Sequence, residues 1–175
     1  MGEQKAGIIK CALDQENLSP QYEKLFLAAA GAAKQTGRAM MVHIEKGSDP
    51  LLLLDFLLDQ GVQAHQIVFC HMDRAIPDLA VHKKVLDAGV YLEFDTIGRF
   101  KYHSDEQEIA LFQTLLDQGK FAVIPVDMCG AIAMKRHYPT VIIFCKCKRE
   151  QMIRSILEKE MDNHEKMLRL VSLEN

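Results

Sequence analysis

The sequence predicts an α/β fold in which parallel strands alternate with helices. Short apolar runs alternate with longer helical patterns at a repeat of roughly thirty residues, and glycines close the helical patterns. Such units form a parallel sheet that is either open or closed into a barrel, and periodicity alone does not choose between the two. In both folds the ligand side lies at the C-terminal ends of the strands.

Four pairs of strand and helix are expected in the first two-thirds of the chain. The apolar runs 6–13, 38–44, 66–72 and 90–97 are the expected strands. The expected helices are 21–36, 50–60, 78–88 and 106–118, which end at Gly37, Gly61, Gly89 and Gly119.

Composition and charge exclude several classes of protein. The chain has 175 residues, of which 49% are hydrophobic and 26% charged, as is typical of a globular protein. A net charge of −3 with scattered basic residues excludes a nucleic-acid footprint. The sequence has no signal-peptide pattern and no apolar run of membrane-spanning length, so we expect a cytoplasmic protein that does not contact a membrane. The five cysteines lack CxxC spacing and are expected to be buried or reduced thiols.

Three side chains that can bind metals come at the predicted ends of successive strands. Lys10 closes the first apolar run, His43 the second and His71 the third, each about one βα unit after the last. Two imidazoles on neighbouring strands can share a zinc-like ion if a carboxylate-type ligand completes the site. Lys10 could take part only when deprotonated or converted to a carbamate. A single histidine of this kind is usually a rim or core residue, but the regular repetition favours a metal site.

Other polar residues near the strand ends are weaker candidates. Asp73 could orient the histidine two residues before it or bind substrate, and a solvated loop carboxylate is the alternative. Arg99 follows the fourth strand, where substrate-contacting loops lie. Three further histidines are expected at the surface, namely His65, His82 and His103.

Four segments resemble consecutive motifs of the phosphotriesterase family, including its resistance-protein and lactonase-like relatives. They are AGIIKCAL, AAAGAAKQTGRAMMVHIEKG, DQGVQAHQIVFCHMD and AGVYLEFDTIG, in the family's order and spacing. The resemblance implies a TIM (β/α)8 barrel with two divalent metal ions, zinc by preference, and a metal-bridged hydroxide that attacks phosphoester, lactone or carboxylic ester bonds of small molecules. Lys10 would be the carboxylated bridging lysine of the fourth strand, and His43 and His71 would be ligands on the fifth and sixth. Asp95 would lie on the seventh strand, beside the substrate.

Residues 1–120 are therefore expected to form a partial barrel of four strands. The HxH motif of the family's first strand does not occur in the sequence, so we expect three strands and part of the metal site to be absent. The chain would then be either a hydrolase or an inactive fragment. A four-stranded sheet has an open edge, which predicts a homo-oligomer. Asp127 ends the run FAVIPVD and could imitate the eighth-strand aspartate that acts as catalytic proton acceptor.

Residues 121–175 carry a second resemblance. The segment VDMCGAIAMKRHYPTVIIFCKCKREQMIRSIL is similar to the C-terminal half of guanylate kinase-like domains, which implies a short P-loop-kinase-like α/β segment. Asp127 and Gly130 would lie near the nucleotide, and Arg154 and Arg169 near a lid. The Gly-rich phosphate loop that opens such domains does not occur in the sequence. A metal-dependent hydrolase is therefore the leading interpretation. The alternatives are a guanylate kinase-like nucleotide-binding protein and a non-catalytic truncated or chimeric remnant.

Overall fold

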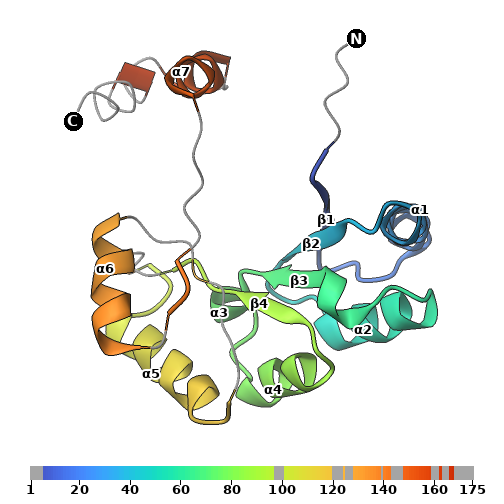
Figure 1. Ribbon diagram of the computed structural model, residues 1–175. Helices are drawn as coiled ribbons and strands as arrows, with labels where there is room; N and C mark the ends of the chain where they lie inside the picture. The colour runs from blue at the N-terminus through green and yellow to red at the C-terminus, as the bar shows by residue number, and fades with distance from the viewer. Residues whose placement is uncertain are drawn as a thin grey trace. The chain divides into compact units, whose positions relative to one another are not determined.

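The chain divides into two compact units, residues 1–128 and 129–175. A computed structural model describes residues 6–96, 101–119, 124, 128–138, 140–142, 148–158, 162 and 166–167. The first unit contains the sheet and its helices (Figure 1).

Four parallel strands form one sheet in the first unit. They are β1 (Ile8–Leu13), β2 (Ala39–Ile44), β3 (Ile67–Cys70) and β4 (Tyr91–Glu93), hydrogen-bonded in the order β1-β2-β3-β4. Every neighbouring pair is parallel, so each connection has to cross back along the sheet. The predicted α/β fold with parallel β/α units is confirmed. β1 and β4 form the two edges of this sheet, and association of copies through an edge stays a prediction.

Helices make these connections. They are α1 (Pro20–Thr36), α2 (Pro50–Asp59), the short 3-10 helix η1 (Ala64–Gln66), α3 (Met72–Ala75), α4 (Leu79–Asp87) and, after β4, α5 (Asp105–Leu116). The four longer helices lie where the sequence predicts them. α3 and η1 are not expected from the sequence pattern, because each is a single turn too short to show a periodicity.

Local side-chain chemistry sets where the helices begin and end. The Asp49 carboxylate accepts hydrogen bonds from two backbone N–H groups in the first turn of α2, at 3.0 and 3.1 Å. Ser104 and Gln107 form a capping box at the start of α5. Gly37 ends α1 in the left-handed conformation with a φ of 67°, which glycine adopts without steric cost.

One face of the sheet is buried beneath helices. Cys11, Val42, Phe69 and Leu92 pair across the four strands in one row, and all of them are buried. They belong to one apolar cluster with side chains of α1, α2 and α4, and Figure 1 shows these helices beside the sheet. Burial of this face is the main source of the stability of the first unit.

The opposite face of the sheet carries the alternate residues and is more accessible. His43 pairs with Cys70, and Cys70 pairs with Glu93, so these three side chains stand in one row. Lys10 is exposed on the same face and pairs with Met41, one row earlier. The sheet thus separates the polar side chains of the strands from the apolar core.

The strand ends differ from two of the expectations. Lys10 does not close β1, because the three residues after it continue to pair with β2 as far as Leu13. β4 ends at Glu93, earlier than predicted, and Asp95 follows the strand by two residues. The reason is that the backbone N–H groups of Asp95 and Thr96 donate to a side chain, the carboxylate of Asp73.

In the second unit the structure describes helical segments. α6 (Met128–His137) begins at the boundary between the units, and α7 (Arg149–Glu158) follows. The described residues of this unit contain no strand. Among the described helices of the whole chain, none has the length and apolar character needed to cross a membrane.

Replacing Gly31 and Gly37 by alanine should change stability in opposite directions. A Cβ on Gly31, inside α1, would meet no described atom within 4 Å, so Gly31→Ala should raise the free energy of unfolding by about 1 kcal/mol. Gly37→Ala would force alanine to a φ of 67° and should lower it by about 1 kcal/mol. Urea denaturation would measure both changes, and shifts of the same sign would contradict this account of α1.

Candidate functional site

Two imidazoles meet where β2 and β3 end. His43 is the fifth residue of β2, and His71 directly follows the last residue of β3. Their ring centroids are 4.5 Å apart, with an angle of 67° between the rings. Parallel pairing of the two strands brings about this contact. The structure therefore brings together two of the three ligands proposed from the sequence.

The backbone of His71 is strained. Its φ of 67° and ψ of 24° place a non-glycine residue in the left-handed region at the junction of β3 and α3, at a cost of about 1–2 kcal/mol. The backbone N–H of His71 donates to Glu93 Oε2 at 3.0 Å, and its carbonyl oxygen accepts from the N–H of Ala75 at 2.9 Å. These hydrogen bonds hold the turn and direct the imidazole. Strain of this kind is concentrated at functional sites.

Two carboxylates from the end of β4 lie beside His71. Asp95 Oδ1 is 2.9 Å from His71 Nδ1, and Glu93 Oε2 is 3.6 Å from the same nitrogen. Burial raises the pKa of Glu93, although its hydrogen bond from the His71 backbone acts in the opposite direction. His71, Glu93 and Asp95 each offer a ligand atom, and these atoms lie within 4.8 Å of one another. Imidazole nitrogen and carboxylate oxygen together suit a zinc-like ion.

Lys10 lies on the same face but contacts neither imidazole ring directly in the described structure. Its Nζ donates to the carbonyl oxygen of Cys11 at 3.0 Å. Burial and the charge of Glu93 raise the pKa of Cys70 to about 12, and the charge of Lys10 opposes this shift. Lys10 lies in the row next to that of His43, and its described hydrogen bond is to the backbone rather than to an imidazole.

Two residues that contact His43 or Asp95 are not expected from the sequence. Glu45 Oε2 lies 3.3 Å from His43 Nε2. Arg74 Nε lies 3.6 Å from Asp95 Oδ1, and its guanidinium stands over the ring of Tyr102, 5.2 Å from the centroid. The sequence signal for Glu45 is its position, two residues after His43 at the strand end.

Asp73 is buried and links the ends of β3 and β4. Its Oδ2 accepts hydrogen bonds from the backbone N–H of Asp95 at 3.0 Å and of Thr96 at 2.9 Å, and from the Thr96 hydroxyl. The alternative that Asp73 is a solvated loop carboxylate is wrong. These hydrogen-bond donors lie on the segment after β4, so Asp73 positions Asp95, which in turn contacts His71. Two other predicted site residues, Arg99 and Asp127, lie outside the described residues.

A second polar cluster lies next to Asp73. His103 Nε2 contacts Glu108 Oε2 and lies 2.7 Å from Thr96 Oγ1. Burial raises the pKa of Glu108 to about 7, with a further contribution from the negative charge of Asp73 and opposition from its hydrogen bonds to His103 and Thr96. His103 is expected at the surface, and the structure shows it only partly exposed, because its imidazole contacts the buried carboxylate of Glu108.

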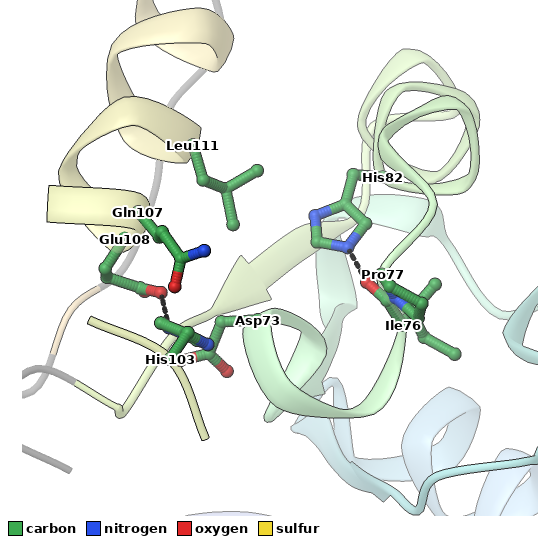
Figure 2. A pocket seen from close by; sticks show the side chains of 8 residues that line it. All are labelled: Asp73, Ile76, Pro77, His82, His103, Gln107, Glu108 and Leu111. Atoms are coloured by element: carbon green, nitrogen blue, oxygen red, sulfur yellow. Dashed lines mark hydrogen bonds and ion pairs between the residues drawn. The ribbon is translucent and has the colours of Figure 1, made fainter. Parts of the chain in front are cut away.

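A cavity of about 210 Å³ adjoins this cluster (Figure 2). His82, also expected at the surface, lines it and is buried, because its ring packs on Phe94 and its Nε2 donates to the carbonyl oxygen of Ile76 at 2.7 Å. His65 is exposed, as predicted. The cavity is lined by Asp73, Ile76, Pro77, His82, His103, Gln107, Glu108 and Leu111.

Parallel β/α units with imidazoles and carboxylates at the ends of consecutive strands are the architecture of metal-dependent barrel hydrolases. The family model described as phosphotriesterase family matches residues 2–139. The chain belongs to the phosphotriesterase family. Its predicted partial barrel agrees with this assignment.

Relatives of known sequence support the assignment. The chain is 37% identical over 127 residues to the phosphotriesterase homology protein of Escherichia coli, an alignment that covers 72% of this chain and 43% of that protein. It is 30% identical over 137 residues to the phospho-furanose lactonase of Mycoplasmopsis synoviae, covering 77% of this chain and 38% of that protein. The chain thus spans less than half the length of these relatives.

Solved structures show the same relationship. The crystal structure of the Escherichia coli homology protein, with phosphate in its active site, superposes with a TM-score of 0.60 at 36% identity and covers 67% of this chain and 41% of that one. A lactonase from Listeria monocytogenes superposes with a TM-score of 0.64 at 26% identity, covering 70% and 38%. The family match extends through residue 139, into the segment 121–175 for which the sequence analysis predicts a guanylate kinase-like domain. A guanylate kinase-like identity of residues 121–175 stays a prediction.

Glycine and alanine at position 71 should differ in stability. Both His71→Gly and His71→Ala remove the imidazole, but alanine keeps the cost of a φ near 67° and glycine does not. We expect His71→Gly to be more stable than His71→Ala by about 1 kcal/mol. Chemical denaturation of metal-free protein would measure the difference. A more stable alanine variant would show that the left-handed turn is not retained.

Glu108 should make the metal-free protein less stable as pH rises. Its folded pKa of about 7 exceeds its ordinary value of 4.5, so between these values the unfolded chain releases the proton first and unfolding is favoured. Denaturation curves in chelator at several pH values should show this decline in the parent protein. Glu108→Gln should flatten it, whereas Glu106→Gln, an exposed change on the same helix, should not. An unchanged pH profile in Glu108→Gln would contradict the assignment.

Proposed function

We propose that this protein is a metal-dependent hydrolase that acts on an ester bond of a small molecule. The observation that carries the proposal is the contact between His43 and His71, with ring centroids 4.5 Å apart at the ends of neighbouring strands of a phosphotriesterase-family fold. Both imidazoles lie on the sheet face that is not buried by the core, where a substrate has access.

The residues at the strand ends fit a divalent ion of the zinc class. His43 and His71 would supply nitrogen ligands, and the carboxylates of Glu93 and Asp95 would supply oxygen ligands or the hydrogen bonds that orient His71. Such an ion would supply Lewis-acid polarisation of the ester and lower the pKa of water. Lys10 is proposed to join them as a carbamate, since its exposed side chain lies on the same face, one row from His43.

The other residues of the site would position and balance these groups. Asp95 lies within hydrogen-bond distance of His71 Nδ1, which selects the tautomer that leaves Nε2 available as a ligand. Asp73 holds Asp95 through its backbone N–H. Arg74, beside Asp95, keeps a positive charge near the carboxylates and would attract an anionic or carbonyl-bearing substrate. Asp127 as proton acceptor and Arg99 as substrate contact are carried over from the sequence as parts of the proposal.

A lactone is the favoured substrate. One relative is named a phospho-furanose lactonase, and one structural neighbour is a lactonase. A phosphoester is the second choice. The family's name and the phosphate bound in the Escherichia coli structure both point to phosphorus as the atom that is attacked. A non-catalytic role is the outcome if the protein binds metal and hydrolyses neither class.

Turnover and metal content together test the proposal. Protein reconstituted with zinc or manganese should hydrolyse lactones or aryl phosphotriesters, followed by acid release or by absorbance of the leaving group. His43→Asn and His71→Asn should each lose activity and metal affinity by about 10–100-fold, because each removes one imidazole ligand. His65→Asn is the matched control, since His65 is exposed on η1, and it should behave like the parent. Equal activity of the His43 and His65 variants would overturn the assignment.

A further inference from the structure

We propose that Asp73, His103 and Glu108 form a second divalent-metal site, distinct from the imidazole contact at the strand ends. Each of the three residues offers a ligand atom, and these atoms lie within 4.8 Å of one another. They come from three separate segments: α3, the loop before α5, and α5 itself. One imidazole and two carboxylates form a ligand set that zinc and manganese accept.

Two buried oxygens in this cluster lack hydrogen-bond partners. Asp73 Oδ1 and Glu108 Oε1 have none among the described residues. Asp73 is 8% exposed and Glu108 is 1% exposed, and both residues line the cavity of Figure 2. A buried carboxylate oxygen without a partner is costly, because folding removes its hydration and supplies nothing in return. A cation bound by these two carboxylates would supply positive charge to a pair of groups that is not fully hydrogen-bonded.

The number of protons available for hydrogen bonds in the cluster also favours a bound cation. Thr96 Oγ1 lies 2.7 Å from His103 Nε2 and 3.3 Å from Glu108 Oε2, and it also donates to Asp73 Oδ2. A hydroxyl has a single proton, so it can donate to one of these groups at a time. The charge of Asp73 also opposes ionisation of Glu108. A divalent cation would remove this repulsion and neutralise the two carboxylates.

The cavity gives the cluster a route to solvent and room for a further ligand. Figure 2 shows Asp73, His103 and Glu108 grouped on one side of the cavity and His82 on the other. His82 Nδ1 is buried and has no partner among the described residues, so it offers a hydrogen-bond acceptor to the occupant of the cavity. Three protein ligands and one open position are the pattern of a zinc site that exchanges its fourth ligand.

Metal at this site would tie α5 to the ends of β3 and β4. Asp73 would then be shared, because its Oδ2 already accepts from the backbone N–H groups of Asp95 and Thr96. The ion would therefore stabilise the segment that carries Asp95, a neighbour of His71. This role requires binding but no turnover, so it is independent of the proposed hydrolase activity.

The test uses the full chain with His43 and His71 replaced, so that the imidazole contact at the strand ends cannot bind metal. In a His43→Asn/His71→Asn background, chelator-treated protein is titrated with cobalt(II) by calorimetry and visible absorption, and with zinc in thermal melts. We expect about one ion per chain with a ligand-field band, and a higher melting temperature with zinc. Glu108→Gln and His103→Gln in the same background should each weaken binding by about tenfold or more.

The matched control is Glu106→Gln, which removes an exposed carboxylate from the same helix and should leave binding unchanged. The proposal is overturned if the background protein binds no cobalt, or if Glu108→Gln and His103→Gln bind it as tightly as Glu106→Gln does. His103 lies outside the helix, so its variant decides the question if Glu108→Gln fails to fold. Failure of the hydrolase proposal would appear elsewhere, as absent turnover in the parent protein.

Discussion

A single buried carboxylate holds the polar part of the first unit together. Asp73, at the start of α3, accepts hydrogen bonds from the backbone N–H groups of Asp95 and Thr96, which follow β4. This prevents the two residues from continuing the strand and places Asp95 beside His71 on one side, and Thr96 beside His103 and Glu108 on the other. Both clusters therefore depend on the same hydrogen bonds, which are shielded from water and correspondingly strong.

The two clusters differ in the positively charged groups that lie near their carboxylates. His71, Glu93 and Asp95 have Arg74 close by, whose guanidinium offsets part of the negative charge. Around Glu108, burial and the negative charge of Asp73 raise the pKa of the carboxyl, and the hydrogen bond with His103 opposes this rise. The guanidinium of Arg74 thus supplies positive charge to the first cluster, whereas the described residues of the second cluster include no arginine, and a cation could supply that charge.

The regular part of the fold is predictable from the sequence because it depends on local patterns. Apolar runs and helix-ending glycines such as Gly37 locate the strands and helices, and the positions of His43 and His71 after apolar runs place them at neighbouring strand ends. The irregular part depends on contacts distant in sequence. Nothing near Asp73 reveals that its partners lie 22 and 23 residues later. The burial of His82 and the partial burial of His103 follow from contacts that no periodicity encodes.

The division of the sheet into a buried and an accessible face also bears on how this protein can be altered. Along β2, alternate side chains either join the core, as Val42 does, or face the site, as His43 does. Residues of the second kind can be exchanged with little effect on core packing. Mutagenesis of every second position of β2 would therefore change the surface that faces the site with little loss of stability. The two-residue alternation of β2 therefore shows which positions of this strand can be varied in protein engineering.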